Sequence, residues 1–445
     1  MDAADATPQG QPLHRIALRG DLLDFVTAPP WGAVECAAVR WRPDHWLLIE
    51  NGRIAGAQPG SDTPDDSWTR RDHRGRLILP GFVDTHVHSP QLDVIASHGT
   101  ALLDWLDTYT FPAERRYADV LEAQAGAARF LDALLAHGTT SAVVFPTVHK
   151  ASADTLFAAA AARGMRLVAG KVLMDRHAPP GLLDDPVDHG ARDCVDLIDR
   201  WHGRARLAYA VTVRFAPTST PAQLAMAGQL CTAYPGVYLQ THLAENRDEV
   251  RWVHELFPAA RSYLDVYDAA GLLNARGVFA HGIWLDDEDR AALRDACAQI
   301  AHSPSSNLFL GSGLFDWRAA EAAGVRVSIG TDVGGGTSLS MQRTLADAYK
   351  VQALRGEKLT AWTALHAATL GAAAALGLSE EIGSFATGCA ADVCVWDWTA
   401  GPVAARRHEM ARHLHERVFA WMILSDDRNL ACTLVNGNVR YERPS

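Results

Sequence analysis

Two histidines separated by one residue, His86 and His88, end an apolar run that begins at Phe82. Side chains two positions apart on a strand point to the same face, so both imidazoles can reach one metal ion. The same spacing recurs at His413 and His415, in a polar, helix-like stretch with no apolar run before it. A His-x-His pattern alone is a weak indication of metal binding. We interpret the second pair as solvated and look for further ligands to support the first.

Side chains suited to metal binding or acid–base catalysis follow several other apolar runs. They are His242, with Glu245 three residues later, His281, and Asp332. The pair Arg214-Phe215 ends another such run. Any one of these residues alone is more often structural, as a buried histidine or a helix-capping aspartate. Their convergence on the ends of different runs predicts a metal site.

A site with imidazole and carboxylate ligands could activate a water molecule through a bound metal ion. Three neutral imidazoles and one carboxylate leave a divalent cation with net positive charge, which lowers the pKa of a bound water to about 7. Barrel enzymes with two metals often bridge them with a carboxylated lysine at the end of the fourth strand, but residues 212–214 read Thr-Val-Arg. We therefore expect one ion per subunit. Nitrogen-rich ligation favours zinc, with iron(II) as an alternative.

The elements that must position these residues are short apolar runs that alternate with Ala- and Leu-rich helical stretches. Helices are expected over Ala123–Ala136 and from Asp286, where acidic residues suit the positive end of the helix dipole. Continuous apolar strands are typical of a parallel sheet buried on both faces, and eight of them predict an α/β fold of the (β/α)8 TIM barrel type. The active sites of such barrels lie at the C-terminal ends of the strands. The predicted strands are 82–86, 139–146, 166–174, 207–215, 237–243, 278–283, 299–303 and 325–331.

The two ends of the chain show a different sequence pattern, with short strand-like runs and Asn-Gly turns at 51–52 and 436–437. In the N-terminal part, the expected strands are 33–39, 46–49 and 77–79. We expect both ends to pair into one small β-sandwich domain beside the barrel. The predicted boundaries are 1–81 for its N-terminal part, 82–382 for the barrel and 383–445 for its C-terminal part.

Composition limits the class of protein. The chain has 445 residues, of which 48% are hydrophobic and 21% charged, as in a globular protein. The net charge of -11 and the absence of basic runs argue against nucleic-acid binding. No signal-peptide pattern or bilayer-spanning apolar stretch is evident, so we expect no membrane partner. The seven cysteines are scattered without a CxxC motif, which favours free thiols and a cytoplasmic location.

Several motifs resemble the amidohydrolase superfamily and, within it, its guanine-deaminating members. The resemblance runs from about residue 76 to the end. The superfamily elements are the His-x-His at 86–88 and Thr331-Asp332, whereas Leu102-Leu-Asp-Trp-Leu106 and Val213-Arg-Phe215 are more specific. The remaining matches are Gly170-Lys-Val-Leu-Met-Asp175, Thr241-His-Leu-Ala-Glu-Asn246, Ala280-His-Gly282, Ser303-Pro-Ser-Ser-Asn307 and Ser425-Asp-Asp-Arg-Asn429.

The resemblance implies a mechanism and assigns roles within it. It implies that the metal ligands are His86, His88, His242 and Asp332. His281 would hydrogen-bond the activated water, Glu245 would shuttle protons, and Asp332 would also accept the proton of the water. Attack on C2 of a purine needs the adjacent ring nitrogen protonated, and the departing amine needs a proton afterwards. One carboxyl group close to the water can do both.

The substrate contacts follow from the shape of guanine. Its O6 and N7 acceptors lie on one edge, where the guanidinium of Arg214 can bridge them. The amide of Gln91 both donates and accepts, which suits the edge formed by the ring nitrogens. Phe215, Trp105 and Leu102 would stack on the flat ring or wall it off. The acidic residues of the 102–114 segment, Asp104, Asp107 and Glu114, are expected to be solvated or to fix the loop.

The expected function is thus hydrolytic deamination of guanine to xanthine and ammonia. One alternative is a sister enzyme that acts on 8-oxoguanine, another aminopurine or a triazine. A second alternative is a catalytically silent scaffold of the same fold. The resemblance also implies a homodimer.

Overall fold

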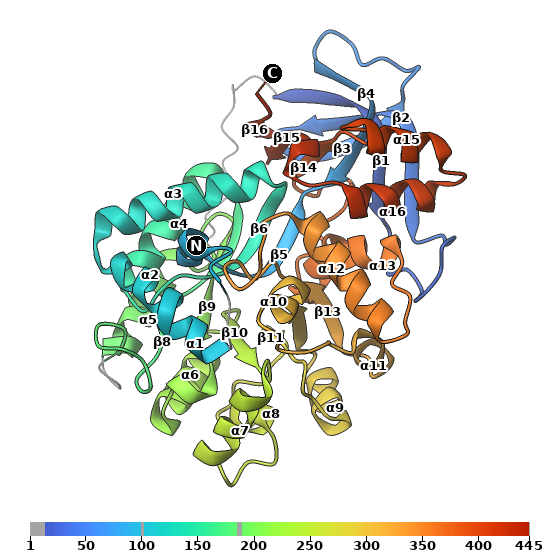
Figure 1. Cartoon of the computed structure of the whole chain (residues 1–445). Helices are drawn as coiled ribbons and strands as arrows, with labels where there is room; N and C mark the ends of the chain where they lie inside the picture. The colour runs from blue at the N-terminus through green and yellow to red at the C-terminus, as the bar shows by residue number, and fades with distance from the viewer. Residues whose placement is uncertain (1–13, 99–101, 185–188, 445) are drawn as a thin grey trace.

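The computed structural model describes residues 14–98, 102–184 and 189–444 of the chain. They form a barrel of parallel strands surrounded by helices and a separate sheet that contains both chain ends (Figure 1). No helix in these described ranges combines the length and the apolarity needed to cross a bilayer.

The barrel sheet follows the order β5-β6-β7-β9-β10-β11-β12-β13, with β8 paired to β9, and all neighbours are parallel. Each of the eight predicted runs forms a strand. The third is split in two at Gly170, where a Cβ atom would lie 1.8 Å from the carbonyl oxygen of Ala210. The strands are β5 (Phe82–His88), β6 (Thr139–Phe145), β7 (Arg166–Ala169), β8 (Val172–Leu173), β9 (Leu207–Val213), β10 (Tyr238–Leu243), β11 (Gly277–His281), β12 (Gln299–His302) and β13 (Arg326–Ile329).

Hydrogen bonds between β5 and the segment that follows β13 close the barrel at its C-terminal end. The backbone N–H of Asp332 donates to the carbonyl of His86 at 2.9 Å, and that of His88 donates to the carbonyl of Val333 at 3.0 Å. Just below, the buried carboxylate of Asp84 accepts a hydrogen bond from the backbone N–H of Thr331 at 3.0 Å. The predicted TIM barrel is confirmed.

Helices follow most of the barrel strands. The predicted helix 123–136 is confirmed as α3, whose N-cap Asp119 accepts from the backbone of Leu121 and Glu122. The helix expected from Asp286 is α9, and Asp286 caps it. The helices are α1 (Leu102–Trp105), α2 (Phe111–Arg115), α3 (Val120–Ala136), α4 (Lys150–Arg163), α5 (His189–Trp201), α6 (Pro221–Ala233), α7 (Arg247–Leu256), α8 (Tyr263–Ala269), α9 (Asp287–Asp295), α10 (Pro304–Phe309), α11 (Trp317–Ala322), α12 (Met341–Leu354), α13 (Ala361–Ala367) and α14 (Leu370–Ala375).

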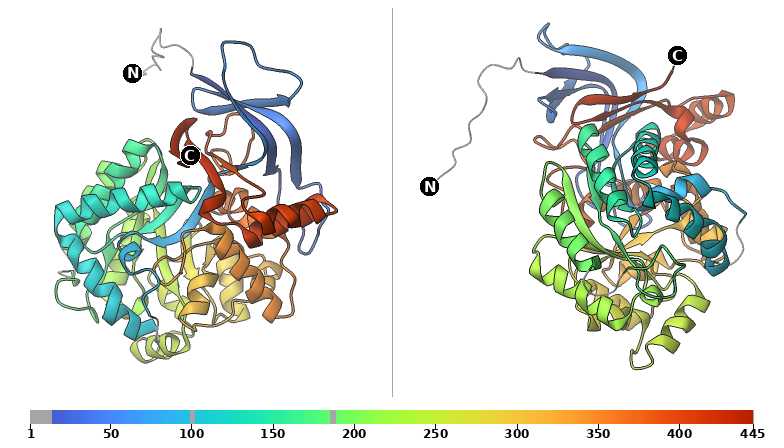
Figure 2. Two further views of the ribbon diagram at one scale, coloured as in Figure 1. Left: turned by 45° about the horizontal axis from the view of Figure 1, so that its top comes forward. Right: turned by 90° about the vertical axis from the view of Figure 1, so that its left-hand side faces the viewer.

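The second sheet has seven strands in the order β16-β15-β14-β4-β1-β2-β3, so strands from both chain ends lie side by side (Figure 2). The predicted small β domain built from both chain ends is confirmed, although its described strands form one continuous sheet and not the two sheets of a sandwich. Some of its apolar residues form a separate core, whereas others, such as Leu79 and Trp396, belong to the core of the barrel. The domain boundaries stay a prediction. The strands are β1 (Arg15–Phe25), β2 (Val39–Glu50), β3 (Arg53–Pro59), β4 (Thr69–Pro80), β14 (Val393–Trp396), β15 (Leu430–Val435) and β16 (Asn438–Glu442), with α15 (Pro402–Met410) and α16 (Leu414–Leu424) between β14 and β15.

Both Asn-Gly pairs turn between adjacent strands of this sheet, with positive φ at Asn51, Gly52, Asn436 and Gly437. That is the geometry of a type I′ hairpin. The strand expected over 33–39 is wrong, since only Val39 belongs to a strand. Most of the run forms bends and turns, and only Ala38 is buried.

The second His-x-His pair was expected to be solvated, which holds for His413 but not for His415. His413 is exposed and caps α16 by accepting from the backbone of Glu416. His415 is half-buried instead of solvated, because its Nε2 accepts from the backbone N–H of Ala361 at 3.2 Å. Its ring also lies against the edge of Trp362. Neither histidine belongs to a metal-ligand cluster in the described part of the chain.

Candidate active site

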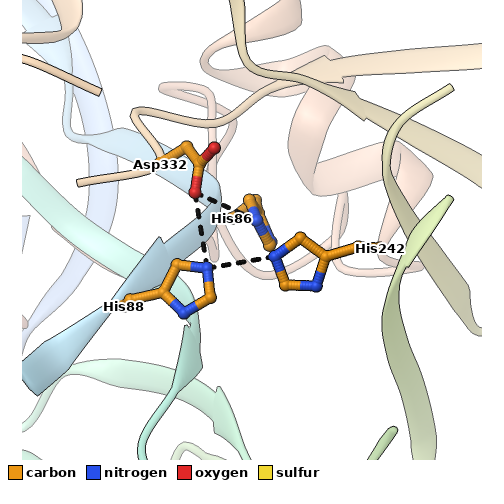
Figure 3. A group of neighbouring side chains, drawn as sticks. All are labelled: His86, His88, His242 and Asp332. Atoms are coloured by element: carbon orange, nitrogen blue, oxygen red, sulfur yellow. Dashed lines mark hydrogen bonds and ion pairs between the residues drawn. The ribbon is translucent and has the colours of Figure 1, made fainter. Parts of the chain in front are cut away.

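Four of the predicted ligands meet at the C-terminal mouth of the barrel: His86 and His88 from β5, His242 from β10, and Asp332 just after β13 (Figure 3). Their potential ligand atoms all lie within 4.8 Å of one another. The Nε2 atoms of His88 and His242 are 3.2 Å apart, and the Nε2 of His86 lies 3.2 Å from Oδ1 of Asp332. The structure therefore brings residues from three distant segments to one centre.

The donor atoms of this cluster fit a divalent cation. His242 directs Nδ1 at the carbonyl oxygen of Arg214, 2.7 Å away, which places the proton on Nδ1 and leaves a lone pair on Nε2. The buried Nε2 of His86 has no hydrogen-bond partner within the described residues. Burial lowers the pKa of His88 to about 3 and the pKa of His242 well below its usual value. Neutral imidazoles beside a carboxylate form a ligand set typical of zinc.

His281 and Glu245 lie beside this cluster. The Nε2 of His281 is 3.4 Å from Oε2 of Glu245 and 3.7 Å from Oδ2 of Asp332. Its Nδ1 lies 2.8 Å from the side-chain oxygen of Asn307, which fixes the ring and turns Nε2 toward the two carboxylates. Ser312 donates to Oε1 of Glu245 at 2.9 Å. An imidazole held between two carboxylates can orient a water molecule and pass its protons on.

Glu245 is only 3% exposed. Burial, and then the nearby negative charge of Asp332, raise its pKa to about 8, while the hydrogen bond from Ser312 acts in the opposite direction. Glu245 is therefore protonated at neutral pH and can donate a proton. A buried carboxyl group tuned in this way is typical of a general acid.

Three residues at this mouth adopt left-handed backbone conformations: Ala244 (φ 48°), His281 (φ 71°) and Asp332 (φ 52°). Each such residue raises the energy of the folded chain by about 1–3 kcal/mol and persists only when its surroundings impose it. Here the turn at Ala244 lies between His242 and Glu245, and the other two occur at catalytic candidates themselves. The strain lies where the side chains must converge.

All five residues predicted to contact a substrate line one cavity: Gln91, Leu102, Trp105, Arg214 and Phe215. His88, His242, Glu245, His281 and Asp332 line the same cavity. The residues predicted to bind the substrate and the residues predicted to carry out the chemistry therefore face the same cavity. Leu102 and Trp105 come from α1, and Arg214 and Phe215 directly follow β9.

Glu114 of α2 is not solvated. Its side chain is fully buried, and both of its oxygens accept from Nη1 of Arg214, at 2.8 and 2.7 Å. From the sequence, two roles were open for Glu114, solvated or fixing the loop. The first is wrong, because the fold encloses α2 against the end of β9, whereas the contact with Arg214 fits the second. Asp104 and Asp107 are exposed, as predicted.

Three further polar residues of the site were not predicted as functional. Asn307 and Ser312 hold His281 and Glu245, as described above. Glu249, on α7, is also buried, and its Oε2 accepts the backbone N–H groups of Glu245 and Asn246 at 3.0 and 3.1 Å. Asn307 belongs to the Ser303–Asn307 motif, which could have indicated it, whereas nothing in the local sequence around Glu249 signals its burial.

The chain belongs to the amidohydrolase family, whose sequence pattern matches residues 77–440. A curated relative, the guanine deaminase of Escherichia coli, is 44% identical over 96% of this chain and 98% of its own length. The solved structure named E. coli guanine deaminase has a TM-score of 0.93 and covers 96% of this chain and 100% of that one.

Two further guanine deaminase structures are similar to the chain at lower sequence identity. The one from Bradyrhizobium japonicum is 32% identical, with a TM-score of 0.92 over 97% of this chain and 100% of that one. The one from C. acetobutylicum, described as having guanine bound in the active site, is 27% identical, with a TM-score of 0.86 over 96% and 99%.

Proposed function

We propose that this enzyme is a guanine deaminase, which hydrolyses guanine to xanthine and ammonia. The observation that carries the proposal is the cavity in which Arg214, Gln91 and Trp105 face the same space as Glu245 and the histidine cluster. The full-length similarity to the E. coli guanine deaminase supports the choice of substrate.

We propose that one divalent cation, zinc by preference, is held by His86, His88, His242 and Asp332. The support is the convergence of their donor atoms, the burial of His86, His88 and Asp332, and the lowered pKa of His88 and His242. When bound, such a cation supplies a water molecule of lowered pKa as the nucleophile.

Side chains of the protein carry out the proton transfers of the reaction. Asp332 accepts the proton of the attacking water, and His281, fixed by Asn307, orients that water through Nε2. Glu245 donates its proton to the ring nitrogen next to C2, which makes C2 electrophilic. It then takes up the proton of the new hydroxyl group at C2 and passes it to the amine, so that the C2–N bond breaks, a carbonyl forms at C2 and ammonia leaves as a neutral molecule. The proton held by Asp332 finally restores the acid form of Glu245.

The other side chains of the cavity hold the purine for this attack. The guanidinium of Arg214 donates to O6 and N7, and the amide of Gln91 meets the edge that carries the ring nitrogens. Phe215 and Trp105, both nearly fully buried, confine the flat ring. Correct orientation of C2 toward the water contributes to the rate because the reacting atoms are already close together.

A product assay tests the proposal. Purified protein, with its metal content measured on the same sample, is supplied with guanine, and xanthine and ammonia are quantified. Guanine should give both products, 8-oxoguanine, 2-aminopurine and triazines should react more slowly, and one zinc per chain should be present. Negligible turnover of guanine by metal-loaded protein would refute the function.

Assembly and location are further proposals. We propose a homodimer, on the basis of the family resemblance, and a cytoplasmic location, supported by seven cysteines that are all free thiols. Light scattering coupled to size-exclusion chromatography checks the first, because a mass of one chain, 48.2 kDa, would contradict it.

A further inference from the structure

Glu114 lies behind the substrate cavity and contacts both polar side chains that we assign to purine binding. It receives two hydrogen bonds from Nη1 of Arg214 and a longer one, 3.4 Å, from Nε2 of Gln91. Arg214 and Gln91 line the cavity, whereas Glu114 does not. A carboxylate in this position can act on the substrate only through these two residues.

The contacts with Glu114 fix the orientation of Gln91. Because Glu114 can only accept when ionised, the NH2 group of Gln91 must face it, and the amide oxygen then accepts the backbone N–H of Gly334 at 3.2 Å. The opposite orientation of the amide would place two donors against each other at Gly334 and two acceptors against each other at Glu114. The carboxylate of Glu114 and the backbone N–H of Gly334 together determine which atom of Gln91 can donate to the substrate and which can accept.

The same carboxylate determines which part of Arg214 is free. Nη1 makes both contacts with Glu114, and no other hydrogen bond joins the guanidinium to the described residues. Nη2 and Nε therefore remain for a ligand. The ring of Phe111, from the same short helix as Glu114, lies 5.1 Å from the guanidinium carbon and restricts it further. Helix α1, which places Trp105 on one wall of the cavity, thus leads along the chain to α2, which holds Arg214.

We propose that Glu114 is a positioning residue for substrate recognition, which holds Arg214 and Gln91 in the arrangement that selects a purine with an oxygen at C6. This inference rests on the proposed function and extends it. Glu114 also neutralises Arg214, so the site presents directed donors to a neutral purine without a free positive charge.

A structural role alone would have different consequences. If Glu114 only anchored α2 to the end of β9, its loss would weaken every ligand of the cavity by a similar factor. If it positions Arg214 and Gln91, its loss should weaken ligands that carry the C6 oxygen much more than ligands that lack it. Hypoxanthine keeps O6 and N7 of guanine without the reacting amine, and purine lacks O6, so the two form a matched pair of inert probes.

The experiment compares the metal-loaded wild type, Glu114→Gln and the control Thr110→Val by calorimetric titration with hypoxanthine and purine. Thr110 is a suitable control because it is equally buried in the adjoining turn, and its hydroxyl has no partner among the described residues. We expect Glu114→Gln to raise the Kd of hypoxanthine by about tenfold or more and that of purine by less than about twofold. Thr110→Val should leave both unchanged.

A double-mutant cycle shows whether the effect passes through Arg214. In an Arg214→Met background, adding Glu114→Gln should raise the Kd of hypoxanthine by much less than the roughly tenfold expected in the wild-type background, because only the contact of Glu114 with Gln91 is left to lose. Equal weakening of both probes by Glu114→Gln, or no weakening of hypoxanthine, would overturn the inference while leaving the proposed function intact. Failure of the wild type to deaminate guanine would instead overturn the proposed function and, with it, this inference.

Discussion

Replacing Glu245 with glutamine removes an exchangeable proton from the candidate site and changes little else. The side chain keeps its volume, and the amide oxygen can still accept the hydrogen bond that Ser312 donates to Oε1 at 2.9 Å. Glu245 is not among the four clustered ligands, so the metal content should stay the same. Substrate binding should also persist, because Arg214 and Gln91 are untouched.

The size of the effect follows from the proton transfers that Glu245 is proposed to make. A positioned general acid contributes about 100- to 10,000-fold to a rate. Since Glu245 is proposed to serve both the ring nitrogen and the leaving amine, Glu245→Gln should lower kcat by a factor in this range, or about 2.7–5.4 kcal/mol. KM should change much less, since the lost interaction arises during the chemical step.

Steady-state kinetics on guanine, with metal analysis of each preparation, measure both expectations. Glu255→Gln is a matched control, since Glu255 is an exposed glutamate on the following helix α7. It should behave as the wild type. A Glu245→Gln enzyme with kcat within about threefold of the wild type would remove Glu245 from the mechanism, and loss of metal in this variant would move it into the ligand set.

Three other results are expected. Because protonated Glu245 is the active form and its pKa is raised to about 8, kcat/KM should fall about tenfold per unit above that pH, and Glu245→Gln should lack this alkaline limb. Arg214→Ala should lower kcat/KM for guanine by about 30- to 900-fold, equivalent to about 2–4 kcal/mol, with unchanged metal content, and an unchanged kcat/KM would exclude its role. Lys171, 1% exposed, forms an ion pair with Asp184. Lys171→Met should leave this carboxylate buried and unpaired and lower the free energy of unfolding by about 3–5 kcal/mol, as measured by urea titration. Adding Asp184→Leu should restore part of the lost stability.

The barrel could be predicted because each of its strands is a continuous apolar run, a pattern that depends on burial of both faces. Its break at Gly170 could not, since it depends on how closely the chain approaches Ala210. In the small sheet, β1 was missed because Arg15, Arg19 and Asp21 interrupt its apolar residues, and its partners β2 and β4 decide its structure.

The metal cluster was predictable for a related reason. His86, His88, His242 and Asp332 occur at the ends of strands, and the fold fixes where parallel strands end. The pairing of Glu114 with Arg214 was not predictable, because the two are far apart in sequence and an acid on a short helix is usually exposed. Only the packing of α2 onto the barrel shows that this carboxylate is enclosed.

The route of the chain between its two sheets has a consequence for biosynthesis. β4 of the outer sheet runs through Gly81 directly into β5, while the neighbour of β4 on one side, β14, is almost the last strand to leave the ribosome. A nascent chain that stops before residue 332 has three imidazoles and lacks the carboxylate. The complete ligand set is therefore expected to form only after all the barrel strands have been synthesised.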